Sequence, residues 1–105
     1  MRELTLNDGT VVKLDTKLNI KKLMMINRDF NTDQFATLRG SKQAVDFNIM
    51  SASHAVYIAY RQANMTNYMH FDEFFDKYDF DTEEAMEIYS EMLFSNVKKK
   101  YIPKR

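Results

Sequence analysis

Few residues in this 105-residue sequence have the chemistry of a catalytic or metal-binding group. The chain has two histidines, His54 and His70, and no cysteine, so thiolate nucleophiles and thiolate metal sites are excluded. No serine or carboxylate stands where it would single out either histidine as a general base. Zinc needs three or four ligands, which two histidines and scattered carboxylates do not supply. We expect no enzyme activity, no catalytic residue, no metal and no cofactor.

A run of carboxylates invites comparison with a calcium loop. It comprises Asp76, Asp79, Asp81, Glu83, Glu84 and Glu87. A loop starting at Asp79 requires glycine at its sixth position, where Glu84 stands, and glutamate at its twelfth, where Ser90 stands. Both requirements fail, so these side chains are interpreted as helix N-terminal and solvated charges. The only glycines, Gly9 and Gly40, exclude a glycine-rich phosphate loop.

Aromatic side chains are concentrated in one stretch of thirteen residues. The candidate partner-binding residues are Tyr68, Phe71, Phe74, Phe75, Tyr78 and Phe80. Core packing is the simpler interpretation. The alternative is that one side stays exposed as an anchor for a protein partner, since aromatics dominate interface hot spots. The eight methionines allow the same two interpretations, gap-filling in the core or an adaptable binding surface.

Charge and hydropathy narrow the class of protein. Fifteen basic and fifteen acidic residues cancel, which argues against a general nucleic-acid binder. The N-terminus has no apolar signal core and no apolar run approaches the roughly 20 residues of a membrane span, so a cytoplasmic protein without membrane contact is expected. The charges are unevenly placed. An acidic segment over 71–91 is followed by a basic tail over 98–105, which is either a solvated helix end or a contact for an acidic partner.

The elements that position these residues begin with a β-hairpin over 2–14. Apolar and polar residues alternate on both sides of Asn7-Asp8-Gly9. A three-residue loop with Gly9 in a left-handed conformation pairs Leu4 with Val12 and keeps the apolar residues on one face. A two-residue Asp8-Gly9 turn would place Leu4 opposite Lys13. The three-residue loop is therefore predicted. Such a hairpin is marginal alone and must dock on helices or on another chain, and its edge is a template for a second subunit.

Four helices are predicted after the hairpin. The first spans about 16–29, capped by Asp15 or Thr16, with Ile20, Leu23, Met24 and Ile26 on its buried face. The second, about 42–64, is apolar on most of its circumference and is expected to be the central helix, with one stripe formed by Val45, Ile49, Ala52, Val56, Ala59 and Ala63. Helices over 70–77 and 82–99 follow. Asp81 and Glu84 form a capping box for the last of them.

These patterns predict a mainly α, single-domain bundle (1–105) around the helix at 42–64, with an N-terminal β-hairpin. Its segments LNDGTVVKL, LNIKKLMMI, ASHAVYIAYRQ, MHFDEFFDKYDFD and EEAMEIYSEML stand in an order that resembles the tail assembly chaperones of long-tailed bacteriophages, of the kind found in phages and prophages of Gram-positive bacteria. The similarity covers about residues 3–97. It rests on element order and on the aromatic and aliphatic pattern.

The resemblance implies a non-enzymatic role in virion morphogenesis. Such chaperones bind the tape measure protein, keep its long apolar helices soluble, help to recruit tail tube protein, and are absent from the finished virion. It implies a host-cytoplasmic protein that works as a possible homo-oligomer. The competing interpretation is a small helical DNA-binding regulator, for which the central helix offers only Lys42 and Arg61 against Asp46. An adaptor unrelated to phages is also open.

Overall fold

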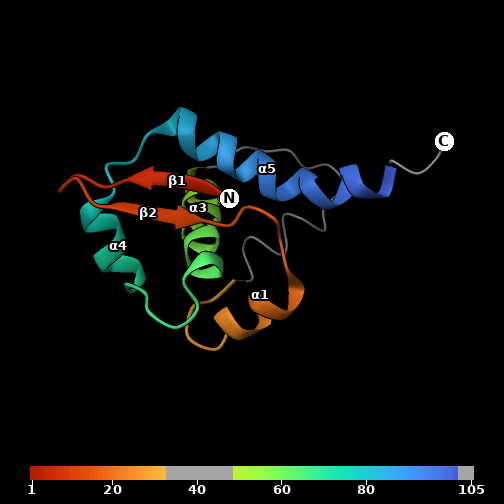
Figure 1. The fold of residues 1–105 in the computed structure, drawn as a ribbon, viewed down its shortest axis with the longest axis horizontal. Helices are drawn as coiled ribbons and strands as arrows, with labels where there is room; N and C mark the ends of the chain where they lie inside the picture. Colours follow the sequence, from red (N-terminus) through yellow and green to blue (C-terminus); the bar gives the residue numbers. More distant parts are fainter. Residues whose placement is uncertain (33–48, 102–105) are drawn as a thin grey trace.

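The computed structural model describes residues 1–32 and 49–101, with side chains through Phe94. This part is mainly helical, with four helices and an N-terminal hairpin of two antiparallel strands. The hairpin crosses in front of the central helix, α5 crosses this helix near its N-terminal end, and α1 lies toward its C-terminal end (Figure 1). The predicted fold class is confirmed.

The hairpin comprises β1 (Arg2–Thr5) and β2 (Val11–Leu14). Leu4 lies opposite Val12, as the three-residue loop requires. Leu6 N–H donates to the Thr10 carbonyl at 2.7 Å, and Gly9 has a φ of 89°. A positive φ is easy only for glycine, so Gly9 allows this turn to close. The register buries three leucines, Leu4, Leu6 and Leu14, against the helices.

The central helix is α3 (Ile49–Ala63). Every residue from Ala55 to Gln62 is buried, because the hairpin, α1 and α5 pack against different sides of it. Ala52, Val56 and Ala59 lie on the buried stripe as predicted, whereas Ile49 is exposed, which corrects its predicted place there. The predicted start of the helix, 42–48, lies outside the described residues.

The first helix is shorter than predicted. α1 spans Ile20–Ile26, and its cap is Asn19, whose side chain accepts from Lys22 N–H, so the expected cap at Asp15 or Thr16 is wrong. The reason lies on α3. The Gln62 side-chain amide donates to the carbonyls of Asp15 and Lys17 at 2.9 and 3.1 Å, which holds this segment outside the helix.

The last two helices lie close to their predicted bounds. α4 spans Phe71–Lys77 and α5 spans Thr82–Tyr101. The Asp81 carboxylate accepts from Glu84 N–H at 3.1 Å, which is one half of the predicted capping box. The Glu84 side chain instead accepts from the Tyr78 hydroxyl at 3.0 Å, so it joins the end of α4 to the start of α5.

Candidate partner-binding surfaces

The six aromatic candidates divide into core and surface residues. Phe74 and Tyr78 are buried, whereas Tyr68, Phe71 and Phe75 are half-buried against the core. Phe80 is 36% exposed and is the most accessible of the set. Burial raises the pKa of Tyr78, so its hydroxyl stays protonated and keeps donating to Glu84. Most of this segment serves packing, and its partner-binding role stays a prediction.

Ring contacts explain why α4 docks where it does. The Phe74 ring lies 4.8 Å from Tyr60 and 5.7 Å from Tyr57, both on α3. Phe71 stacks on Phe30 at 5.1 Å. Aromatic pairs at these separations add to the free energy of burial. They join α4 to α3 and to the segment after α1.

Arg61 forms a network of polar contacts inside the protein, whereas the sequence analysis considered it only as a possible DNA contact. Its side chain is 4% exposed, and its guanidinium donates to both Asp29 carboxylate oxygens at 2.9 and 3.1 Å. It also donates to the Tyr57 hydroxyl and lies 3.5 Å from the Tyr68 ring centroid. The Arg61 hydrogen bonds lower the pKa of Asp29. Arg61 is therefore an internal ion-pair partner, with no face left for a nucleic acid.

The two histidines occupy different environments. His54 lies against the rings of Phe30 and Phe71, and its Nδ1 is buried without a hydrogen-bond partner among the described residues. Burial lowers the pKa of His54, so the neutral form is favoured. His70 is exposed and precedes α4 without a side-chain capping bond. Across the described residues, no three His, Asp or Glu side chains converge as metal ligands.

Each strand of the two-stranded hairpin forms one edge of the sheet. Asn64 on the C-terminal side of α3 donates to the Lys13 carbonyl, and Asp15 N–H donates to the Ala59 carbonyl, so β2 is tied to α3. The other edge belongs to β1, and Arg2 at the start of this strand forms 2.8 Å ion pairs with Glu87 and Glu91 of α5. Only a short strand of four residues is available for pairing with another chain. The edge stays a candidate contact.

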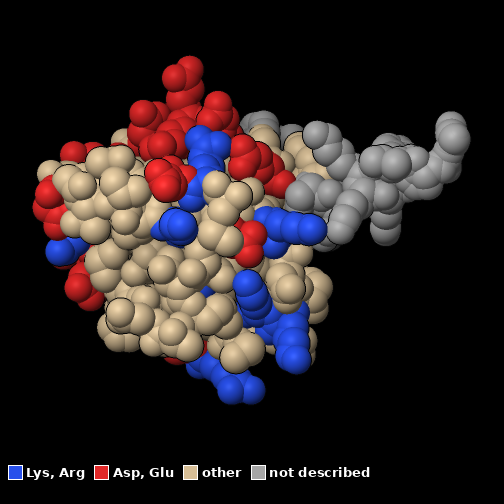
Figure 2. All heavy atoms as spheres, in the orientation of Figure 1, with Lys and Arg blue, Asp and Glu red and all other residues tan. Residues whose placement is uncertain are grey.

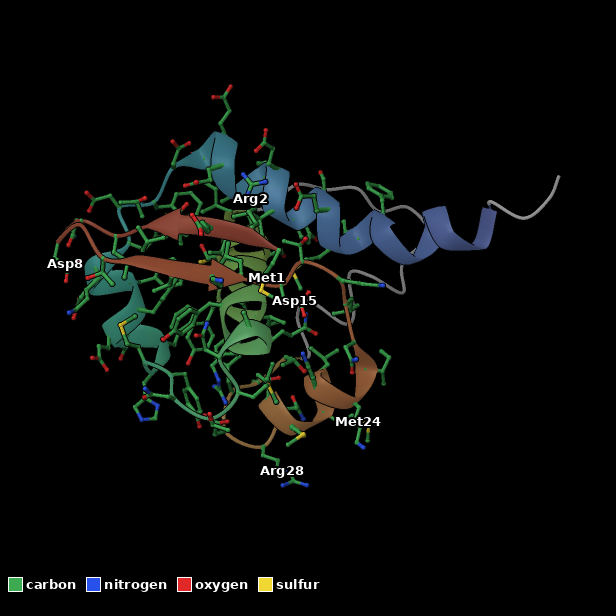
Figure 3. All side chains as sticks on the ribbon, viewed as in Figure 1. Met1, Arg2, Asp8, Asp15, Met24 and Arg28 are labelled. Atoms are coloured by element: carbon green, nitrogen blue, oxygen red, sulfur yellow. The ribbon has the colours of Figure 1, made fainter. Side chains whose placement is uncertain are left out.

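The outer surface of α1 exposes apolar side chains, two of which the sequence pattern had assigned to the buried face. Ile20 and Met24 were expected on the buried face, but they are 59% and 67% exposed, and Met25 is 44% exposed. Leu23 and Ile26 alone turn inward from α1. Met24 projects from the outer side of the helix, and Arg28 points away from the body just beyond it (Figure 3). A helical wheel centred on Leu23 and Ile26 would have placed Ile20 at the margin of the buried face and Met24 outside it.

Opposite charges gather on different sides of the molecule. On the face drawn in Figure 2, Asp and Glu cluster over the start of α5, where Arg2 pairs with Glu87 and Glu91, whereas Lys and Arg gather over α1. An open surface depression lies in the acidic region, lined by Arg2, Thr82, Glu83, Met86, Glu87, Ser90 and Glu91. The side chains of residues 98–101, and residues 102–105 entirely, lie outside the described part of the chain. The role of the basic tail over 98–105 therefore stays a prediction.

Comparisons with known proteins give no relative from which to transfer a function. No protein-family model matches the chain, and no significant match was found among curated proteins or solved structures. Within the described residues, no helix has both the length and the apolar character needed to cross a membrane. The functional argument therefore depends on the surfaces described above.

Proposed function

We propose that this chain is a non-enzymatic chaperone of phage tail assembly, which acts in the host cytoplasm by binding the tape measure protein and helping to recruit tail tube protein. The observation that carries the proposal is a set of exposed apolar side chains, half of them methionines, on three of the helices. Among the described residues, large exposed apolar side chains lie on helices at Ile20, Met24, Met25, Ile49, Met50 and Phe94. Apolar side chains presented by helices suit contact with the apolar helices of a long, otherwise aggregating client.

Methionine supports this interpretation through its physical properties. Its unbranched, polarizable side chain adapts to differently shaped apolar surfaces. Three of the six exposed helical side chains named above are methionines, so these positions suit a client that offers many similar but non-identical helices. Arg61 supports a protein partner over DNA, because the only described cation of the central helix is neutralised by Asp29.

Gene context and co-expression test the proposal. A tail tube gene upstream and a very long tape measure gene downstream are expected, and a metabolic operon at this position would remove the proposal. Co-expression should then keep the tape measure protein in the soluble fraction. We expect Ile49→Glu to weaken this effect, since it places a charge in the apolar surface of α3, while Val11→Glu, on the hairpin and of matched exposure, should retain it.

The co-expression result can also contradict the proposal. If the tape measure protein stays insoluble with the wild-type chain, the chaperone function is wrong. If both variants solubilise it equally, the client surface does not lie at the start of α3, and the aromatic candidate Phe80 becomes the next residue to change.

A further inference from the structure

The outer face of α1 exposes basic and apolar side chains but no carboxylate. Lys21 and Arg28 are seven positions apart, so at about 100° per residue they lie on nearly the same side of the helix, opposite its buried residues. Arg28 follows the last residue of α1 and continues its turn, because its N–H donates to the Met25 carbonyl at 3.2 Å, and its side chain points away from the body of the molecule (Figure 3). Met24 and Met25 flank these two cations and are both exposed. No acidic residue occurs from 16 to 28.

The side-chain groups left unbonded on this face are all hydrogen-bond donors. Asn27 Oδ1 accepts from the Thr32 N–H and hydroxyl at 2.9 and 2.8 Å, whereas its Nδ2 donates to no atom of the described residues. Asn19 Oδ1 accepts from the Lys22 N–H at 3.0 Å, which again leaves only a donor, Nδ2. Within the described part of the chain, the two outermost cations form no ion pair. The face therefore offers donors and no spare side-chain acceptor.

This face is held in position by contacts on the inner side of α1. Asn19 N–H donates to the Gln62 side-chain oxygen at 2.9 Å, and Lys22 Nζ donates to the Gln62 carbonyl at 3.2 Å. Asp29, the first carboxylate after the face, is bound by Arg61 and does not compete for the exposed cations. A surface on a fixed helix loses less conformational entropy on binding than a free loop does.

The composition and arrangement of the face select the kind of partner. Unpaired cations and amide donors require a partner rich in anionic acceptors, and exposed methionines require apolar side chains beside those acceptors. The phosphate backbone of DNA supplies only the first of these. A membrane would bury the outermost side chains of the helix, which here are the cations Lys21 and Arg28, with the methionines at their flanks. A protein helix can present carboxylates and apolar side chains side by side.

We propose that the outer face of α1 binds an acidic amphipathic helix of a partner protein. Carboxylates of this helix pair with Lys21 and Arg28, and its apolar side chains contact Met24 and Met25. A shallow depression beside Met24, lined also by Leu23, Asn27 and Thr32, accommodates one of those apolar side chains. The identity of the partner rests on the proposed function, in which this helix belongs to the tape measure protein. Charge on α1 then determines which segments of that client are bound.

Fluorescence anisotropy with two labelled peptides tests the contact on the purified chain. The acidic probe is an amphipathic helical peptide of Leu, Ala and Glu, and the basic probe is the same peptide with Lys in place of every Glu. The wild-type chain should bind the acidic probe at about 50 mM salt and lose about tenfold in affinity at about 500 mM. It should not bind the basic probe at either salt concentration.

Charge reversal on α1 should exchange the two probes. Lys21→Glu should weaken binding of the acidic probe by about tenfold, and Lys21→Glu/Arg28→Glu should bind the basic probe instead. Lys13→Glu, at an exposed lysine of β2, changes the net charge as Lys21→Glu does and should bind the acidic probe as the wild type does. Met24→Gln should weaken binding without a change of charge. Circular dichroism checks that each variant is folded, and a gain of basic-probe binding cannot result from unfolding of the face.

Three outcomes would overturn the proposal. They are a wild-type chain that does not bind the acidic probe at about 1 mM, a Lys13→Glu variant that loses as much affinity as Lys21→Glu, and tighter binding of duplex DNA or of phosphatidylserine-containing vesicles than of the acidic probe at the same salt concentration.

Co-expression with the tape measure protein separates this contact from the chaperone function. If the wild-type chain binds the acidic probe but leaves the tape measure protein insoluble, the α1 contact stands and the chaperone function is wrong. If the wild-type chain and Lys21→Glu keep the tape measure protein equally soluble, the chaperone function stands and α1 is not its contact with that client.

Discussion

Arg61 and Asp29 are joined by two hydrogen bonds of 2.9 and 3.1 Å, which connect the C-terminal part of α3 to the segment that follows α1. The Arg61 side chain is buried, whereas Asp29 keeps 40% of its side chain exposed. A buried charge that loses its partner is more costly than an exposed one, because water cannot replace the lost hydrogen bonds. The ion pair can therefore be tested by replacing either Asp29 or Arg61.

We predict that Asp29→Asn lowers the free energy of unfolding by about 1–3 kcal/mol, less than for a fully buried pair because Asp29 is partly solvated. In an Arg61→Met background the same change should cost much less, with a coupling of about 1–2 kcal/mol. Urea unfolding of the four chains measures this cycle. Additive effects would show that the two side chains do not stabilise one another.

The burial of His54 predicts that the folding stability of the chain depends on pH under mildly acidic conditions. Its folded-state pKa lies below the ordinary 6.5 because burial disfavours the charged form. The unfolded chain therefore binds a proton more readily, so the stability associated with neutral His54 is complete above pH 6.5 and is lost as the pH falls toward the folded pKa. The melting temperature should decrease over this interval, and His54→Phe should flatten the decrease. An unchanged profile in that variant would exclude His54 as the cause.

Asp29 predicts a separate effect at lower pH. Its folded pKa is lowered from 3.8, first of all by the Arg61 hydrogen bond. Its contribution is therefore present above pH 3.8 and disappears as the pH falls through the folded pKa. Asp29→Asn should reduce the acid sensitivity of unfolding below about pH 4 while leaving the His54 interval unchanged. Unfolding followed by circular dichroism from pH 7 to pH 2 separates the two.

Phe74 and Phe80 provide a matched pair within the aromatic segment. Phe74→Ala should cost about 3–5 kcal/mol, since it removes a fully buried ring that contacts Tyr57 and Tyr60. Phe80→Ala, at a site 36% exposed, should cost less than about 1.5 kcal/mol. Denaturant midpoints measure the difference. Equal effects would contradict the division of this segment into core and surface residues.

Gly9 predicts the sensitivity of the hairpin turn. Gly9→Ala should destabilise the chain by about 1–2 kcal/mol, because the φ of 89° strains the backbone of an L-residue. An added Cβ would meet no atom within 4 Å, so a steric clash with neighbouring residues does not contribute. Gly9→Asn should cost less, since asparagine tolerates the left-handed conformation better. Thermal unfolding of both variants checks the order. A costlier asparagine would show that sterics, and not φ, restrict this position.

Sequence periodicity by itself determined the hairpin and the existence of the described helices. Leu4 and Val12 alternate with polar residues, so only one register puts the apolar side chains together, and Gly9 supplies the one conformation that the loop needs. The Asp81 cap is equally local, because its bond reaches only to Glu84 N–H. These features depend on interactions within a few residues, which a sequence pattern contains.

The effects of contacts between residues far apart in the sequence were decided only by the tertiary structure. Gln62 on α3 holds the carbonyls of Asp15 and Lys17, so α1 begins at Ile20, four residues later than its pattern predicts. Arg61 is buried because Asp29, 32 residues away, neutralises it. Ile20 and Met24 look like core residues by type, yet α1 turns Leu23 and Ile26 toward α3 and leaves them exposed. Local periodicity gives each helix an apolar face, but the neighbour that packs against the helix selects which part of that face is buried.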